Sequence, residues 1–285
     1  MRHLPVLASV LVLASAPRSL ASPPPPSVGY AWASDYLDKE TRPQVYTPLN
    51  VLDGRDSTVW CASDQQGARA LMTIGFKGVA SLDELRIYTG NGSTRDSFKS
   101  YARAKKITLQ GKNGARNFTL EDKRGLQTVP LNPPITGGWV TLEVKDTYPG
   151  SEPEIPVCLT DVVFYSGGKP LNGTKMAPML KYDARMAPLL GTWFAGHEGA
   201  PDRYLSFYVD GTYRFVYEPL SGEVPTTMAG GFTASSSRLS LELPKKGRIS
   251  VRFNRAEAEG SPGGYTLTLE GDLPDEWKTP FRNQP

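Results

Sequence analysis

Short runs of alternating apolar and polar residues constrain the fold of this chain more than any other feature. Alternation with a period of two is typical of strands that bury one face. The 28 glycines and 25 prolines supply the turns that many short strands need. No helical period of useful length interrupts the first half of the chain. The chain is therefore predicted to be all-β, and in its first half the expected strands are 70–76, 81–88, 105–110, 117–120, 126–131, 139–144 and 157–165.

The 285 residues exceed the usual size of one domain, so two domains are expected. Strand spacing over 29–165 is typical of an antiparallel β-sandwich. Residues 166–188 are rich in glycine, proline and lysine and are expected to be a linker. From 189 to 285, six or seven short strands favour a small closed or nearly closed β-barrel.

A β-hairpin is expected near the start of this barrel, because Asp210-Gly211 is a strong turn signal between two alternating runs. Leu205, Phe207 and Val209 should share one face of the first strand. Tyr213, Phe215 and Tyr217 should share one face of the second. Bulky Phe207 and Phe215 turned inward would fill the barrel, which predicts a structural or docking barrel without a bound lipid.

Residues 1–21 have the pattern of a secretory signal peptide, with a charged start, an apolar stretch and a small-residue cleavage site. The apolar stretch of about 13 residues is too short to span a bilayer. Residues 22–28 follow as a proline-rich spacer. The protein is therefore expected to be secreted, extracellular or periplasmic, and not membrane-spanning.

The charge of the chain argues against a nucleic-acid partner. Removal of Arg2 and Arg18 with the signal peptide takes two positive charges from a net +3 and leaves +1. Acidic and basic residues are balanced in both halves, whereas nucleic-acid binding requires a basic field.

Cys61 and Cys158 are the only cysteines of the chain. An even pair in an exported protein favours a disulfide bond. The alternative is two buried free thiols.

Catalytic chemistry is poorly represented in the sequence. His197 is the one histidine after the predicted signal peptide, and it lies in a predicted turn. The acidic pairs Glu152/Glu154 and Asp275/Glu276 also lie in turn-like segments, where solvated charges are common. No enzymatic activity is predicted.

The segment 50–60 gathers side-chain oxygens in a short loop. Asn50, Asp53, Asp56 and Thr58 surround Gly54, which permits a sharp turn. Oxygen-rich loops of this kind can wrap a hard cation such as calcium. An Asx-type turn between two strands explains the same residues without a metal. Both interpretations are open at this point.

Three motifs in order resemble a known domain family. They are N-x-x-D-G-x-x-x-T-x-W at 50–60, TGNG at 89–92, and YPG followed by CLTDVVFY at 148–165. Together they resemble the discoidin domain, the jelly-roll module of coagulation factors V and VIII. The bacterial glycan-binding, NADase-translocation subgroup is the most similar. The resemblance implies a discoidin-like jelly-roll β-sandwich over about half of the chain, with Cys61 and Cys158 at matching positions.

The resemblance also implies a calcium site. Carried over by motif, Asn50, Arg55 and Thr160 would supply carbonyl oxygens, Asp53 and Asp161 carboxylates, and Thr58 its hydroxyl or carbonyl oxygen. Six oxygens suit calcium. Two positions depart from the family, because Asp161 replaces the usual glutamate and Arg55 a neutral residue.

The implied function is the binding of a glycan or another surface ligand through loops at one end of the sandwich. Sugars are held by aromatic stacking and planar polar groups. The candidates are Trp32, Arg69, Asn91, Arg95 and Tyr101. The alternative function is a protein-interaction or effector-translocation module without sugar binding.

The second domain carries a weaker resemblance. Its G-x-W opening at Gly191 and Trp193, with the YLSFYVDGTYRF hairpin, resembles lipocalin-like domains of small exported bacterial proteins. This implies a lipocalin-like β-barrel.

Overall fold

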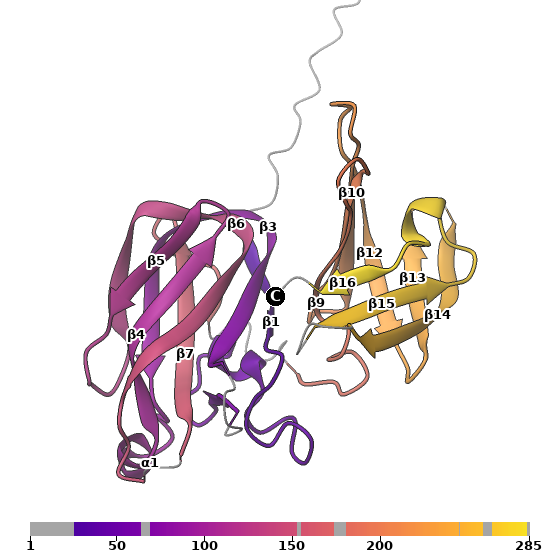
Figure 1. Cartoon of the computed structure of the whole chain (residues 1–285). Helices are drawn as coiled ribbons and strands as arrows, with labels where there is room; N and C mark the ends of the chain where they lie inside the picture. The colour runs from indigo at the N-terminus through magenta and orange to yellow at the C-terminus, as the bar shows by residue number, and fades with distance from the viewer. Residues whose placement is uncertain are drawn as a thin grey trace, which may run out of the picture.

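The computed structural model of the protein describes residues 26–63, 69–152, 155–173, 181–244, 246–258 and 264–283. Strands dominate these residues, so the all-β prediction is confirmed. They form two units, one built on β1–β8 and a closed barrel of β9–β16 (Figure 1). The predicted signal peptide lies outside the described residues. Within them, no helix is both long and apolar enough to cross a membrane.

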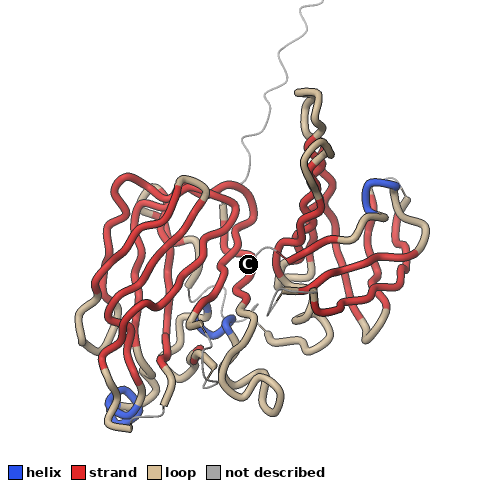
Figure 2. The backbone as a smooth tube through the Cα atoms, viewed as in Figure 1, coloured by secondary structure: helices blue, strands red, loops and turns tan. Residues whose placement is uncertain are grey.

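The first unit is the predicted sandwich, and Figure 2 shows how little helix accompanies its strands. Its hydrogen-bonded order is β1-β3-β6-β4-β7-β2, with β5 on β4 and β8 on β7. The elements are β1 (Ser27–Trp32), η1 (Pro48–Leu52), β2 (Trp60–Cys61), β3 (Leu71–Thr89), α1 (Arg95–Ser100), β4 (Ala102–Gly111), β5 (Gly114–Thr119), β6 (Gln127–Tyr148), β7 (Val157–Ser166) and β8 (Lys169–Pro170).

Two long strands replace four predicted short ones. The segments 70–76 and 81–88 belong to the single strand β3, and 126–131 and 139–144 belong to β6. The pairing of β3 with β6 shifts register between Gly75 and Ala80, where Gly78 has a φ of 97°. A glycine that suggests a turn in the sequence therefore marks an irregularity at which the strand bends and continues.

The predicted disulfide is confirmed. Cys61 on β2 lies directly opposite Cys158 on β7, and their sulfur atoms are bonded at 2.00 Å. Both residues are buried. The bond therefore ties the end of segment 50–60 to the strand that carries Asp161.

The second unit is a closed barrel in the order β10-β11-β12-β13-β14-β15-β16-β9. It has one strand more than the upper predicted number, because the three-residue β16 is too short to show alternation. Its elements are β9 (Gly191–Ala195), β10 (Asp202–Phe207), β11 (Thr212–Glu218), β12 (Thr226–Ala234), β13 (Arg238–Leu243), β14 (Gly247–Glu257), β15 (Tyr265–Glu270), η2 (Asp275–Trp277) and β16 (Phe281–Asn283).

Large side chains fill the barrel. Leu205, Phe207, Tyr213 and Phe215 are all buried, as the hairpin pattern predicts. Val209, predicted on the same strand face as Leu205 and Phe207, lies beyond the end of β10 and is only partly buried, because the strand stops at Phe207 before the turn. Trp277 from η2 is fully buried and stacks on Phe215, with 4.6 Å between ring centroids. An aromatic plug of this kind occupies the space that a ligand would need.

The two units meet along β1 and the β10–β11 hairpin. The Tyr30 and Thr192 hydroxyl oxygens lie 3.0 Å apart, and the Val209 amide donates to the Gly29 carbonyl at 2.9 Å. A Cβ atom on Gly29 would lie 2.5 Å from the Tyr208 ring, so this approach requires glycine. One continuous cluster of buried apolar residues spans both units.

Parts of the predicted spacer and linker belong to the first unit. Strand β1 begins at Ser27, inside the predicted spacer, and β8 lies inside the predicted linker. Leu171 is buried, and the buried Asn172 side chain donates to the Val162 carbonyl at 2.8 Å. The beginning of the linker is therefore packed against the sandwich.

Candidate functional site

The segment from Asn50 to Thr58 begins inside η1 and continues as a tightly hydrogen-bonded loop toward β2. The Asn50 side-chain amide donates to the carbonyls of Val45 and Val59, both at 2.8 Å. The Asp53 carboxylate accepts from the Arg55 amide at 2.9 Å and from the Thr58 hydroxyl at 2.8 Å. The loop therefore has the hydrogen bonds of an Asx turn, and it keeps a nearly buried carboxylate at its centre.

Asp161 lies on strand β7, close enough to this loop for the charges of Asp53 and Asp56 to shift its pKa. Burial, together with the negative charges of Asp53 and Asp56, raises the pKa of Asp161 to about 7. The Val162 amide donates to its carboxylate at 3.0 Å. Burial also raises the pKa of Asp53. The fold thus brings together two buried carboxylates that favour a neighbouring cation.

The remaining predicted ligands, Arg55 and Thr160, form hydrogen bonds within the loop and with the turn at 89–92. The Arg55 carbonyl accepts from the Thr58 hydroxyl at 3.2 Å. The Thr160 hydroxyl donates to the Gly90 carbonyl at 2.7 Å and accepts from the Gly92 amide at 2.8 Å. Among the described residues, no three His, Cys, Asp or Glu side chains are grouped to hold a metal. A cation would therefore need main-chain and hydroxyl oxygens in addition to carboxylates.

Tyr88 and Arg124 also belong to this end of the sandwich, and sequence reasoning missed both. Tyr88 pairs with Asp161 across β3 and β7, and Arg124 donates to the Gly92 carbonyl at 2.8 Å. Burial raises the pKa of Tyr88, Arg124 lowers it, and Asp56 raises it. The position of Tyr88 directly before the TGNG turn was the signal that could have identified it.

The structure spreads the five predicted ligand residues over separate elements. The Arg69 guanidinium forms an ion pair with Glu143 at 2.7 Å, just before β3. Asn91 is nearly buried, and its Oδ1 accepts from the Ser93 hydroxyl at 2.7 Å, which gives it a turn role. Arg95 begins α1 and Tyr101 caps its end, where Tyr101 packs beside the disulfide.

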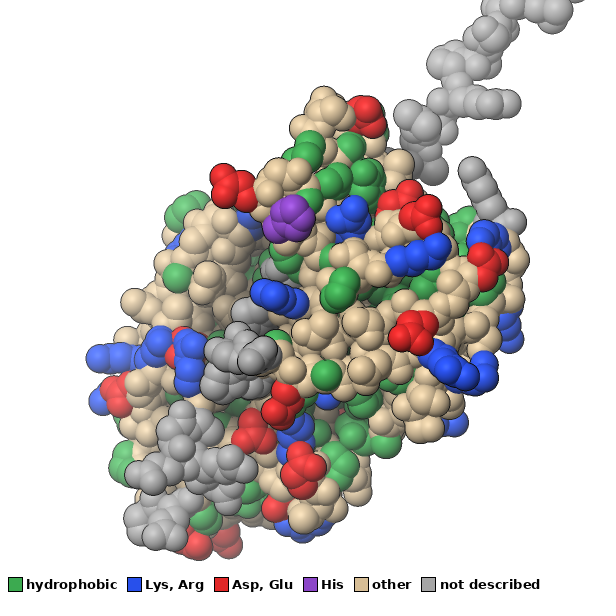
Figure 3. Space-filling view, turned by 45° about the vertical axis from the view of Figure 1, so that its right-hand side comes forward, with side chains coloured by type: hydrophobic (Ala, Val, Ile, Leu, Met, Phe, Trp, Pro, Cys, Tyr) green, Lys and Arg blue, Asp and Glu red, His purple; other side chains and the backbone are tan. Residues whose placement is uncertain are grey.

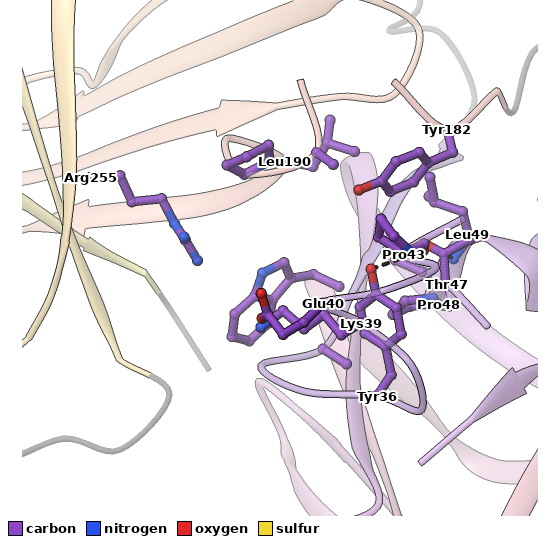
Figure 4. A pocket seen from close by; sticks show the side chains of 15 residues that line it. Tyr36, Lys39, Glu40, Pro43, Thr47, Pro48, Leu49, Tyr182, Leu190 and Arg255 are labelled. Atoms are coloured by element: carbon purple, nitrogen blue, oxygen red, sulfur yellow. Dashed lines mark hydrogen bonds between the residues drawn. The ribbon is translucent and has the colours of Figure 1, made fainter. Parts of the chain in front are cut away.

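Trp32 lines a cavity of about 310 Å³ between the two units (Figure 4). Thr47, Pro48 and Leu49 form one wall and directly precede Asn50 in the chain. The cavity therefore adjoins the start of the Asn50–Thr58 segment. The other lining residues are Ala31, Ala33, Tyr36, Lys39, Glu40, Pro43, Tyr182, Ala187, Pro188, Leu190 and Arg255.

The rings of this cavity are held by hydrogen bonds. The Tyr36 hydroxyl donates to the Pro43 carbonyl at 3.0 Å and lies beside the Tyr182 hydroxyl (Figure 4). Burial raises the pKa of both tyrosines, which therefore stay neutral and able to donate. Below, "junction cavity" denotes this cavity.

Residues 28–165 match the family model of the NAD glycohydrolase translocation F5/8 type C domain. The matched segment begins in β1 and ends in β7, the strand that carries Asp161. These residues form a discoidin-like domain. The match covers the loop, the disulfide and Trp32, and leaves the barrel outside it. No curated protein sequence matches the chain.

Solved structures similar to the chain include carbohydrate-binding modules. The family 32 module of NanJ from C. perfringens, solved with galactose, is 14% identical and has a TM-score of 0.37; the alignment covers 50% of this chain and 99% of that one. The family 32 module of AlyQ, solved with 4,5-unsaturated mannuronic acid, is 16% identical with a TM-score of 0.36, covering 49% and 95%. A mycobacterial arabinofuranosyltransferase, AftD, is 14% identical with a TM-score of 0.41, covering 90% of this chain and 24% of that one.

Proposed function

We propose that the protein is an exported, non-enzymatic binding protein that recognises carbohydrate in the junction cavity between its discoidin-like domain and its barrel. The observation that carries this proposal is the cavity lining, which combines the Trp32, Tyr36 and Tyr182 rings with the polar ends of Glu40 and Arg255. Sugars bind where an aromatic face covers their apolar side and a few polar groups meet their hydroxyls. A discoidin-like domain with such a cavity suits this role.

Export is supported by the disulfide, because such bonds persist in oxidising compartments. A binding role is supported by the description of the matched family as a translocation domain. His197, the histidine that the sequence analysis considered for catalysis, is exposed on a turn. Its Nδ1 lies 2.9 Å from the Glu198 carbonyl oxygen. On the face in Figure 3, acidic and basic side chains are intermixed, which does not suit a nucleic-acid partner.

Calcium is the second part of the proposal. Asp53 and Asp161 would hold the ion with oxygens of Asn50, Arg55, Thr58 and Thr160. These residues fit a calcium ion, because the Asp53 and Asp161 carboxylates are buried and the pKa of Asp161 is raised. The positive charge of a bound cation would lower this pKa again. A bound ion would hold the loop against β7 and so fix η1, which forms one wall of the junction cavity.

A glycan array probed with the mature full-length chain tests the proposal. The Trp32→Ala variant should lose about tenfold or more in affinity for the best glycan, since aromatic stacking and area burial both disappear. Trp139→Ala is the matched control, because Trp139 is also half-buried but lines a different hollow between the units. Equal losses in both variants would show that the junction cavity is not the binding site.

The family description favours one alternative, a translocation module that docks onto another protein. In that case the mature chain would bind no glycan on the array. It would instead bind a NAD glycohydrolase directly in isothermal titration calorimetry, and Trp32→Ala would leave this affinity unchanged.

A further inference from the structure

Arg255 enters the junction cavity from the barrel, outside the discoidin-like domain. It lies on β14, and Figure 4 shows its guanidinium directed from the barrel toward the wall that carries Glu40 and Tyr36. Its Cζ lies 3.2 Å from the centroid of the Tyr265 ring, so the ring supports the guanidinium from one side. Stacking of this kind pre-positions an arginine while its N–H edges stay available.

The Arg255 side chain is half-buried and interacts with the Tyr265 side chain. Its Nε is buried and has no hydrogen-bond acceptor. Burial lowers the pKa of Arg255, and interactions with Tyr265 and Glu257 oppose this effect. In the part of the chain that the structure describes, no carboxylate forms an ion pair with it. A half-buried guanidinium that forms no ion pair with a carboxylate can bind an anion, because a partly desolvated charge is stabilised by an opposite charge.

The other charges of the junction cavity limit the anion to a single negative charge. The Lys39 ammonium already donates to the Ser34 carbonyl at 2.5 Å. Glu40 is exposed on the wall opposite Arg255 and would repel a second negative charge. A planar carboxylate matches the arginine fork with two parallel hydrogen bonds, whereas a doubly charged phosphate would meet Glu40.

We infer that the junction cavity binds a carboxylate-bearing sugar, with the Arg255 guanidinium holding the carboxylate and Trp32 covering the sugar ring. The inference rests on the proposed function and names its ligand class. It makes the barrel a part of the binding site, because the discoidin-like domain alone lacks this arginine.

Isothermal titration calorimetry on the mature full-length chain tests the inference. The probes are galacturonic acid and 3′-sialyllactose, which carry a single carboxylate on different sugars, with lactose as the neutral control. Arg255→Gln should weaken binding of the preferred acidic sugar by about ten- to a hundredfold, the range for a hydrogen-bonded charge. Binding of lactose should change less than about threefold.

Two further variants separate recognition from general charge effects. Arg255→Lys keeps the charge without the planar fork and should give an intermediate loss. Arg252→Gln removes an exposed arginine from the same strand and should leave both affinities unchanged. Equal melting temperatures for all variants establish that they are folded.

The possible failures are distinguishable. Lactose binding as tight as acidic-sugar binding, with no effect of Arg255→Gln, would overturn the acidic-ligand inference and leave the proposed function standing. Equal losses in Arg252→Gln and Arg255→Gln would overturn it as well, since bulk charge would then explain binding. A wild-type chain that binds none of the probes, and no glycan on the array, would overturn both.

Discussion

The discoidin-like domain and the barrel differ in what they bury. Among the described residues, the domain buries nine polar or charged side chains, including Asp53, Asn91, Thr160 and Asp161, whereas Thr192 is the single buried polar side chain of the barrel. Buried polar groups cost stability unless they are bonded, so they tend to gather where function requires them. The polar side chains that could hold an ion or a ligand are therefore concentrated in the discoidin-like domain. The interior of the barrel is filled, so the barrel can contribute to binding only through its outer surface.

The largest expected effect is on the barrel core. Phe215→Ala should lower the free energy of unfolding by about 3–5 kcal/mol, because it removes a buried ring against Trp277. Urea unfolding followed by tryptophan fluorescence measures this change. Val216→Ala, on the opposite face of the same strand, should cost less than half as much. Similar losses for the two variants would show that the barrel is not packed as described.

Loss of the disulfide should be nearly as large for the discoidin-like domain. Replacing Cys61 and Cys158 with serine should lower the free energy of unfolding by about 2–4 kcal/mol, since the bond closes a long loop of the unfolded chain. Chemical denaturation measures this loss. The wild-type chain, denatured without reductant, should show no titratable thiol; two free thiols would contradict the bond.

Calcium should stabilise the discoidin-like domain and leave the stability of the barrel unchanged. At a concentration a hundred times its Kd, the ion should add about 2.7 kcal/mol and raise the melting temperature. Asp53→Ala should abolish this shift, and Asp56→Ala should leave most of it, because Asp56 is exposed. A melting temperature that is the same in millimolar calcium and in chelator would leave the Asx turn as the better interpretation of the loop.

The smallest effect concerns the contact between the units. Lys77 forms an ion pair with Asp210 and donates to Thr212 at 3.0 Å. Lys77→Ala should cost only about 0.2–1 kcal/mol, as is usual for partly exposed pairs. If the units fold separately, as the sequence predicts, limited proteolysis near Lys169, Lys175 or Lys181 should release two resistant fragments, sooner in the variant. A single resistant core spanning this segment would contradict separate folding.

The same pair has a defined pH dependence. Burial raises the pKa of Asp210, but the hydrogen bonds from Lys77 and Thr212 outweigh it, and the net pKa is lowered. Its contribution should therefore be complete above the unfolded value of about 3.9 and lost as the pH falls below it. The stability difference between wild type and Lys77→Ala should disappear over that range.

Alternation in the sequence identified most strands, because one buried face imposes a period of two wherever a strand is long enough. It failed at β16, which has three residues, and at Gly78, where a bend resembles a turn. The loop motif identified Asp53, and the resemblance to discoidin domains added Asp161, which the structure places within electrostatic reach of Asp53. Arg255 could not be found, because its cavity exists only after two separately patterned segments pack together.

The closure of the barrel by β16 affects how the protein folds. Phe194 of β9 pairs with Arg282 of β16, so the first and last strands of the barrel must meet. Such pairing between distant parts of the sequence is slow, because loop-closure entropy is lost before the contacts form. Until β16 arrives, β9 and β15 present open edges that can pair with another chain. Deletion of Phe281–Asn283 should therefore convert a monomeric folding reaction into a concentration-dependent one, with aggregation detectable by light scattering during refolding.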